Sequence, residues 1–208
     1  MPECKRVFDV SCCLVVGALA LLPGVAIAVA VRLSSAGPVL YRGRRLGRDG
    51  REFDLLKFRT MTASDAGPRV TSADDRRVTP VGRWLRRTKL DELPQLVNVL
   101  RGEMSIVGPR PEDPHYAAYF PAEYATVLTV RPGITGAAAV RFRHEEAMLS
   151  GSTAADLDGS YLKEILPAKL ALDLEYVAHH DVRTDVSILL ATLRALLRRI
   201  DESGHGPQ

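Results

Sequence analysis

The chain has 208 residues, enough for one compact domain with a short appendage at about 100–200 residues per domain, which excludes a multidomain assembly. Its charge is uneven: residues 1–110 carry 19 Lys and Arg against 11 Asp and Glu, whereas residues 111–208 carry 9 against 14. A basic first half joined to a long uncharged stretch favours a negatively charged partner at a membrane surface, and we expect no nucleic-acid partner.

The uncharged stretch comes first in the chain and covers the 22 residues 10–31. As a helix it would extend about 33 Å, enough to cross a hydrocarbon core of about 30 Å. Pro23 lies near its middle, where a proline removes a backbone hydrogen bond and kinks or breaks a helix. Both flanks are basic, and such flanks favour the cytoplasmic side of a membrane. The pattern predicts a re-entrant helix that breaks at Pro23 and returns to the same face.

Two alternatives remain open for this segment. Lys5 and Arg6, the apolar run and the small residues near Ala28 resemble a cleavable signal peptide, although apolar residues continue past the cleavage position. A buried core helix is the second alternative, although 22 uncharged residues are many for a domain of this size. The three cysteines, in or beside the segment, lack disulfide or metal spacing and indicate a reducing, cytosolic environment.

Beyond the apolar segment, residues 38–60 alternate like two short strands around a Gly-rich turn, which predicts a β-hairpin. Residues 63–77 are interpreted as a mobile loop. Apolar residues spaced three and four apart predict helices over residues 81–85 and 93–100. Residues 186–200 show the same spacing with arginines beside it, so this helix either packs on the core, the commoner outcome, or lies in the headgroup plane.

The predicted fold class is therefore α/β and mostly helical. Residues 1–36 are predicted to form the re-entrant membrane anchor. Residues 37–200 are predicted to form a small cytosolic catalytic domain with a short β-hairpin and amphipathic interfacial helices, and residues 201–208 a disordered tail.

Residues 83–95 form the richest chemical neighbourhood, because four cations precede the adjacent carboxylates Asp91 and Glu92 at the start of a helix. A helix N-terminus stabilises carboxylate and phosphate alike. Adjacent side chains diverge by about 100° in a helix, so one carboxylate is expected to attack or hold a metal while the other orients or takes a proton. Pyrophosphate chemistry typically uses Mg²⁺, few carboxylates and several cations. The alternative is an ordinary capped helix with solvated surface charges.

Further cations extend this candidate site. Lys57 and Arg59 are two residues apart along a predicted strand, so both are expected to point to one face as a cationic wall. Arg110 stands between Pro109 and Pro111, which restrict the backbone and would orient the guanidinium for bidentate phosphate or base contacts. For Arg110 a simple turn is the equal alternative.

Five motifs, taken together and in this order, resemble the bacterial sugar transferase family, the monotopic polyprenol-phosphate phosphoglycosyl transferases. They are KFRTM (57–61), LDELPQL (90–96), NVL (98–100), MSIVGPRP (104–111) and RPGITG (131–136). The resemblance extends from residue 5 to about residue 197. It implies a re-entrant helix with a proline at its break, which matches Pro23, and a small member without the extra multi-span domain of larger relatives.

The resemblance implies transfer of a phospho-sugar from a UDP-sugar to undecaprenyl phosphate, giving undecaprenyl-diphospho-sugar and UMP. This would be the first membrane step in making a polysaccharide or glycoconjugate, on the cytoplasmic face of the bacterial inner membrane, and is compatible with a homodimer. Asp91 is then the nucleophile that forms a covalent phospho-sugar intermediate in contact with Mg²⁺, with Glu92 as its partner. The alternative function is a catalytically silent membrane scaffold that binds a nucleotide or a partner enzyme.

The resemblance also assigns cations to the substrates. Arg86 matches a family arginine at the phosphate site, and Arg110 matches the motif that recognises the nucleotide. The predicted substrate-binding residues are Lys57, Arg59, Arg86, Pro109, Arg110, Pro111 and Arg131. The chain departs from the family after Gly136, where many members carry Trp-Ala-Gln and Asn-Gly-Arg. Recognition of the sugar or lipid phosphate through that loop stays open, with Arg141 and Arg143 as candidates.

Overall fold

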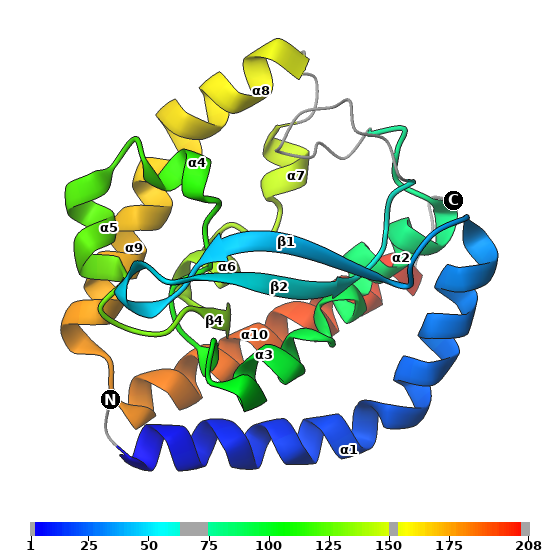
Figure 1. Cartoon of the computed structure of the whole chain (residues 1–208), viewed down its shortest axis with the longest axis horizontal. Coiled ribbons are helices and arrows are strands. Elements are labelled where there is room, and N and C mark those ends of the chain that lie inside the picture. Colours follow the sequence, from blue (N-terminus) through cyan, green and yellow to red (C-terminus); the bar gives the residue numbers. More distant parts are fainter. Residues whose placement is uncertain (1–2, 63–74, 150–153, 205–208) are drawn as a thin grey trace.

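A computed structural model of the chain describes residues 3–62, 75–149 and 154–204. Helices dominate, and two small two-stranded sheets lie between them (Figure 1), which confirms the mostly helical fold class. The early elements are α1 (Glu3–Ser34), β1 (Leu40–Leu46), the turn η1 (Arg48–Gly50), β2 (Glu52–Phe58), α2 (Pro80–Thr88), the 3₁₀ turn η2 (Leu90–Glu92), α3 (Gln95–Arg101) and β3 (Ser105–Val107). The later ones are α4 (Pro114–Ala117), α5 (Pro121–Val127), β4 (Gly133–Thr135), α6 (Ala137–Arg141), α7 (Glu145–Met148), α8 (Ala154–Ser160), the π-helical turn η3 (Tyr161–Ile165), α9 (Leu166–His179) and α10 (Val182–Gly204).

The predicted hairpin is confirmed. Strands β1 and β2 pair antiparallel from Leu40 opposite Phe58 to Leu46 opposite Glu52. The turn between them contains Asp49 and Gly50 with positive φ, as a tight connection requires. Residues 63–74, most of the predicted loop, lie outside the described residues.

The two predicted central helices are also confirmed as α2 and α3. Thr79 caps α2, because its hydroxyl accepts a hydrogen bond from the backbone N–H of Gly82 at 2.9 Å. The fully buried Asn98 of α3 fixes this helix to β2: its Oδ1 accepts from Leu56 N at 3.1 Å and its Nδ2 donates to Asp54 O at 2.8 Å. Strand β2 and the middle of α3 are therefore held in a fixed relation.

A parallel pair of short strands, which the sequence did not predict, joins two of the motif loops. Strand β3 pairs with β4 through Ser105 opposite Gly133 and Val107 opposite Thr135. The backbones approach so closely that a Cβ on Gly133 would lie 2.1 Å from the backbone N of Gly108. Only glycine fits such contacts, so the glycines of these motifs serve the pairing that carries the loop around Arg110.

Helix α1 packs on the domain at both ends and is exposed between them. Lys5, Asp9 and Cys13 near its start and Ile27 and Val31 near its end are buried. Figure 1 shows that α1 runs along one edge of the molecule and then changes direction toward the hairpin. The helix continues through Pro23, so the bend leaves its helical bounds uninterrupted and the predicted break is not confirmed.

These contacts bear on the alternatives for the apolar segment. Among the described residues, α1 is the one helix long and apolar enough to cross a membrane, and only 11% of its most apolar window is buried. A core helix would be mostly buried, so that alternative is wrong. Removal of about 30 residues as a signal peptide would also take Cys13 and Ile27 from two hydrophobic clusters, which argues against cleavage.

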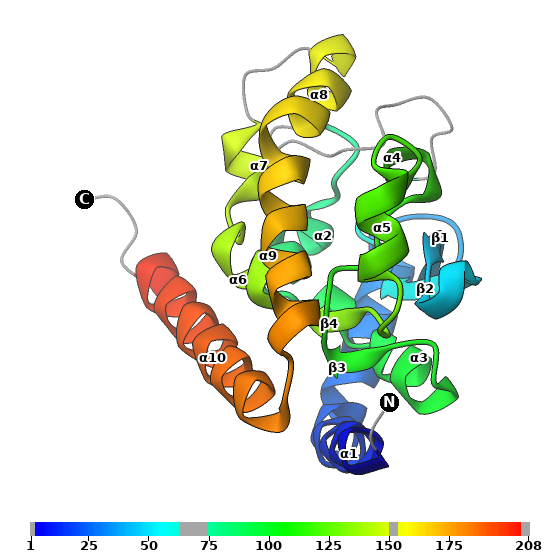
Figure 2. The same ribbon diagram turned by 90° about the vertical axis from the view of Figure 1, so that its left-hand side faces the viewer.

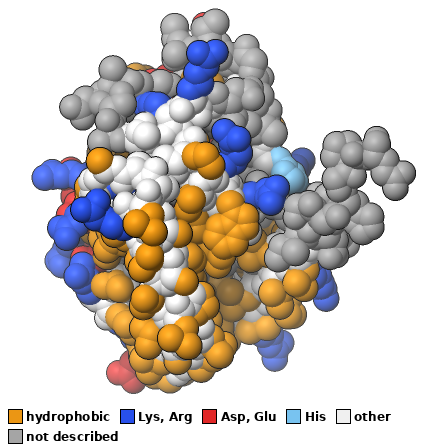
Figure 3. All heavy atoms as spheres, turned by 90° about the vertical axis from the view of Figure 1, so that its right-hand side faces the viewer, with side chains coloured by type: hydrophobic (Ala, Val, Ile, Leu, Met, Phe, Trp, Pro, Cys, Tyr) orange, Lys and Arg blue, Asp and Glu red, His pale blue; other side chains and the backbone are white. Residues whose placement is uncertain are grey.

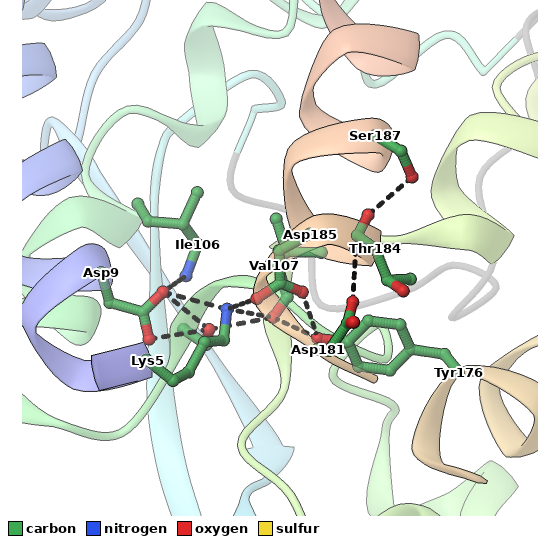
Figure 4. Close-up of polar contacts among 10 residues, drawn as sticks. Lys5, Asp9, Ile106, Val107, Tyr176, Asp181, Thr184, Asp185 and Ser187 are labelled. Carbon is green, nitrogen blue, oxygen red and sulfur yellow. Dashed lines mark hydrogen bonds and ion pairs between the residues drawn. The ribbon is translucent and has the colours of Figure 1, made fainter. Parts of the chain in front are cut away.

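A buried ionic network fixes the start of α1 to the domain (Figure 4). Lys5 Nζ lies 2.7 Å from Asp185 Oδ2 of α10 and 3.2 Å from Asp9 Oδ1. Asp9 accepts hydrogen bonds from Ser105 Oγ at 2.9 Å and Ile106 N at 3.1 Å, and the side chains of both aspartates are almost completely buried. The first turns of α1, which precede the apolar segment, therefore belong to the folded domain.

The last two helices cover the remaining side of the domain (Figure 2), with α9 close to α5 and α10 diverging from it. The interpretation that the apolar row of α10 packs on the core is wrong for most of the row. Its members Val186, Leu190, Leu193 and Leu197 are 41–54% exposed. Leu189, another member of the row, does pack on the core, where the neighbouring Asp185 and Ile188 are also buried. Helix α10 also continues to Gly204, past the boundary predicted at residue 200.

Candidate active site

The end of β2 and the turn η2 bring a lysine onto a carboxylate. Lys57 Nζ donates to Glu92 Oε1 at 2.9 Å, and Arg110 Nη1 lies 3.8 Å from the same oxygen. Burial alone would raise the pKa of Glu92, but Lys57, Lys89 and Arg110 outweigh it and hold that pKa far below its usual range. Glu92 is therefore an ionised carboxylate paired with surrounding cations.

Asp91, the adjacent residue, has a different environment. It is 6% exposed, and its Oδ1 is buried without a hydrogen-bond partner among the described residues. Burial raises the pKa of Asp91, while Lys57 and then Lys89 and Arg86 oppose the rise and the Glu92 charge adds to it. The predicted divergence of the two carboxylates thus holds: one is neutralised by cations, and the other keeps a free oxygen.

Lys89 belongs to the site although the sequence analysis assigned it no role. It links α2 to η2 in the left-handed conformation, with φ 59° and ψ 14°, which is uncommon for a residue other than glycine. Burial lowers its pKa, and Arg110 and Lys57 lower it further, whereas Glu92 raises it. The sequence offered one signal, the position of Lys89 next to the dyad, but its backbone conformation was not predictable.

Arg110 connects the dyad to a second polar cluster. Burial would lower its pKa, but the negative charges of Glu92 and Glu145, with Tyr161 and Glu112, raise it well above the usual range. Pro109 and Pro111 beside it are buried, and Pro109 O accepts from Gly133 N at 2.8 Å, so the loop that carries Arg110 is fixed on both sides. The backbone around Arg110 is thus restrained as expected, whereas the contact of its guanidinium with a phosphate or base stays a prediction.

The second cluster surrounds η3 and α9. Lys169 Nζ lies 2.8 Å from Glu145 Oε2 and 3.2 Å from Tyr161 Oη, and Tyr161 Oη donates to Glu112 Oε2 at 2.6 Å. Asp173 lies nearby, buried, with an Oδ1 that has no partner among the described residues, and burial raises its pKa to about 7. These residues are scattered through the sequence, so no local motif indicated that they meet.

The other predicted cations are placed differently. Arg86 Nε donates to Thr60 Oγ1 at 2.9 Å, and its charge acts on Asp91. Arg59 is buried, and its guanidinium donates to the backbone carbonyls of Ser35, at 2.7 Å, and Pro38. The expectation that Lys57 and Arg59 form one cationic wall is therefore wrong. Lys57 contacts Glu92, whereas Arg59 hydrogen-bonds the backbone that follows α1.

Arg131 likewise has a backbone partner. Its Nε donates to Gly102 O at 2.6 Å, at the end of α3. This places the Arg131 side chain at the end of α3 and not in the contacts around Glu92. Arg141 and Arg143, beyond the point where the chain departs from the family motif, are both exposed.

The residues present fit a divalent cation held partly by substrate. Among the described residues no three His, Cys, Asp or Glu side chains gather as a closed metal site. Mg²⁺, however, typically uses one or two carboxylates with substrate phosphates and water. The buried Oδ1 of Asp91, which has no hydrogen-bond partner among the described residues, is a carboxylate oxygen that could serve as one such ligand.

Two adjacent buried carboxylates, of which Glu92 is paired with cations and Asp91 is not, lie in a domain that carries a helix of membrane-crossing length, and together they form a candidate active site. The chain matches the family described as Bacterial sugar transferase over residues 2–199. It belongs to this family. The recognition made from the five motifs is thereby confirmed.

Individual relatives agree with this assignment. The chain is 42% identical over 199 residues to UDP-glucose:undecaprenyl-phosphate glucose-1-phosphate transferase of Caulobacter vibrioides, covering 93% of this chain and 69% of the relative. It is 39% identical over 201 residues to undecaprenyl-phosphate glucose phosphotransferase of Komagataeibacter xylinus, and the match covers 91% of this chain and 35% of the relative. It is 36% identical over 177 residues to UDP-N-acetylgalactosamine-undecaprenyl-phosphate N-acetylgalactosaminephosphotransferase of Aeromonas hydrophila, and the match covers 83% of this chain and 38% of the relative. The chain thus spans little more than a third of the last two. The predicted enzyme class, a sugar-phosphate transferase, is confirmed at the level of the family.

Proposed function

We propose that this protein transfers a sugar phosphate from a UDP-sugar to a polyprenyl phosphate, with Asp91 as the nucleophile. The observation that carries the proposal is the buried Oδ1 of Asp91, which has no partner while the cations beside it engage Glu92. A carboxylate oxygen free of hydrogen bonds is available to attack phosphorus, and the cations offset the phosphate charge.

The proposed reaction has two displacement steps. An Asp91 carboxylate oxygen attacks the β-phosphorus of the UDP-sugar, and a new O–P bond forms as the bond from this phosphorus to the bridging oxygen breaks. UMP leaves with that oxygen. A phosphate oxygen of the polyprenyl phosphate then attacks the same phosphorus, which forms the diphosphate linkage and releases the Asp91 carboxylate.

The surrounding side chains have separate roles in this scheme. Lys57 keeps Glu92 ionised at 2.9 Å, and the Glu92 charge in turn holds Lys57 and Arg110 at the site. Arg110 and Lys89 would face the diphosphate, and Arg86 would add charge near Asp91. Because burial raises the pKa of Asp91, these cations also keep part of it in the reactive, ionised form.

Mg²⁺ fits the same place. Asp91 would hold it together with the phosphates of the substrate, and the bound ion would supply charge neutralisation of the diphosphate. Only one of the two carboxylates is available for it, because Glu92 is already paired with Lys57.

The membrane topology is part of the proposal. The bend of α1 and the burial of both its ends in one domain support a re-entrant anchor whose ends lie on the same, cytoplasmic side. A single span would separate Lys5 from Ile27, whereas both pack on the same folded unit. The exposed middle of α1 would then lie in the hydrocarbon.

Release of UMP tests the proposal. Purified protein with Mg²⁺ and undecaprenyl phosphate is given UDP-glucose, UDP-N-acetylgalactosamine and other UDP-sugars in turn. We expect UMP release with at least one of them, dependent on the lipid phosphate beyond a single turnover. Measurable UDP binding without UMP from any donor would overturn the proposal and favour a silent scaffold.

A further inference from the structure

An apolar groove lies between the membrane helix and the helix that leads to the dyad. It has a volume of approximately 350 Å³ and is lined by Ile27, Ala30, Pro80, Val81, Trp84 and Leu85. This volume is in the range of small-molecule sites, roughly 300–1,000 Å³. Figure 3 shows this side of the molecule, where hydrophobic side chains gather over the lower part and Lys and Arg side chains border them.

Two residues that line the groove belong to a buried cluster that borders the active site. Ile27 and Leu85 belong to one buried cluster with Phe58, and Leu90 and Leu93 pack against it. Leu90 and Leu93 immediately flank the Asp91–Glu92 pair, and Phe58 follows Lys57 in the chain. An apolar chain in the groove would therefore be separated from the charged groups by this one cluster.

The helix that forms one wall of the groove also carries a cation of the active site. Arg86 follows Leu85 in α2, donates to Thr60 Oγ1 at 2.9 Å and acts by its charge on Asp91, so α2 links the apolar wall to the dyad. Trp84 is 46% exposed at the wall, and tryptophan is typical of the depth where hydrocarbon meets headgroups. The arrangement matches a ligand with a phosphate at one end and a long hydrocarbon at the other.

We propose that this groove holds the isoprenoid chain of the polyprenyl phosphate, next to its phosphate. The inference rests on the proposed function for the identity of the acceptor. A UDP-sugar has no comparable hydrocarbon. A bilayer phospholipid offers an anionic headgroup with acyl chains, and the experiment separates it from the polyprenyl chain.

Trp84 is the sole tryptophan of the sequence and so reports on the groove without labelling. Its emission is followed in phosphatidylcholine nanodiscs as polyprenyl phosphate, polyprenol or phosphatidylglycerol is added. We expect a saturable change with polyprenyl phosphate, a response at least tenfold weaker with polyprenol, and none with phosphatidylglycerol. An equal response to phosphatidylglycerol, or no saturable response to polyprenyl phosphate, would overturn the proposal.

A filled groove gives an independent readout. Ala30→Leu adds bulk inside the groove and suits a helix, so we expect KM for polyprenyl phosphate to rise about tenfold while covalent labelling by UDP-sugar is unchanged. Ala18→Leu is the matched control, because Ala18 is exposed on the other arm of α1 and outside the groove. An unchanged KM in Ala30→Leu contradicts the groove. A saturable Trp84 response in a protein that never releases UMP would instead contradict the reaction and leave the groove standing.

Discussion

Lys57 Nζ and Glu92 Oε1 are 2.9 Å apart, and this contact separates the roles of two adjacent carboxylates. Glu92 is neutralised by the lysine and by Arg110, while Asp91 keeps a buried oxygen without a hydrogen bond among the described residues. The hairpin strand β2 supplies the lysine and the turn η2 supplies the carboxylates, so the asymmetry is a property of the fold.

Lys57→Met is expected to lower turnover at least tenfold and to lower the free energy of unfolding by roughly 2 kcal/mol, because Glu92 would stay buried with one cation fewer. Turnover and urea unfolding measure the two effects. Arg44→Met is the matched control: it removes an ion pair to Glu52 whose side chains are 78% and 47% exposed, and such pairs contribute little. Equal losses in both variants would contradict the account.

Asp173→Asn is expected to change how stability depends on pH. Burial raises the pKa of Asp173 to about 7, so the folded protein takes up a proton as pH falls through 7, whereas the unfolded chain does so near 4. Below pH 4 Asp173 is protonated in both the folded and the unfolded protein, so it does not destabilise the fold through its charge. Above pH 7 its buried charge destabilises the folded protein in full. The amide should therefore raise the unfolding temperature at pH 8, by a free energy on the order of 4 kcal/mol at most, and scarcely at pH 4.5. Thermal unfolding of both proteins across this pH range gives the answer, and a gain that is the same at every pH would contradict the assignment.

Lys5→Met would leave Asp9 and Asp185 buried without their common cation. We expect a loss of about 3–5 kcal/mol in stability, since an uncompensated buried charge is strongly destabilising. Chemical unfolding in detergent provides the measurement. Arg6 is the neighbouring control: Arg6→Met removes hydrogen bonds to backbone carbonyls at the end of α3 but strands no carboxylate, so its loss should be smaller. A larger loss for Arg6→Met would refute the central role of the network.

Pro23 is expected to keep both ends of α1 on one side of the membrane. Cys4 and a cysteine at position 36 (Ala36→Cys in a Cys4→Ser background) are each exposed and can be labelled with a membrane-impermeant maleimide. Both should react in inside-out vesicles and neither in right-side-out vesicles. Pro23→Ala restores the missing hydrogen bond and should straighten the helix, which moves Cys4 to the opposite side in part of the population. Labelling of the two positions from opposite sides in the unchanged helix would show a single span.

Local patterns predicted the elements of this fold well. The hairpin over residues 38–60 and the helices α2, α3 and α10 follow from alternation, apolar spacing and turn residues, all of which act within a few positions. The β3–β4 pair depends on two loops about 28 residues apart in sequence, and three-residue strands carry too little periodicity to detect. The apolar row of α10 could not be assigned for a different reason. A helix that packs on a core and a helix that lies on a membrane surface both carry apolar residues at this spacing, so the pattern does not distinguish them.

The candidate site was predicted in part. Asp91, Glu92, Lys57 and Arg110 lie in motifs, and the structure brings their charges together. Arg59 and Arg131 lie in the same motifs but fasten backbone carbonyls, a role that residue type alone does not distinguish from phosphate binding. Lys169 and Asp173 were missed because their partners come from other segments of the chain and meet only through packing of α9 on the core.

The central claim is that Asp91 forms a covalent bond with the sugar phosphate. The most direct measurement is the mass of the protein after incubation with Mg²⁺ and UDP-sugar without lipid acceptor, followed by peptide mapping. We predict an adduct of one sugar phosphate on the peptide that contains Asp91, lost on addition of polyprenyl phosphate. Asp91→Asn should abolish the adduct and reduce turnover by roughly a thousandfold or more, since an amide cannot replace the carboxylate as the attacking group. An adduct that persists in Asp91→Asn, or that maps to another residue, would contradict the account.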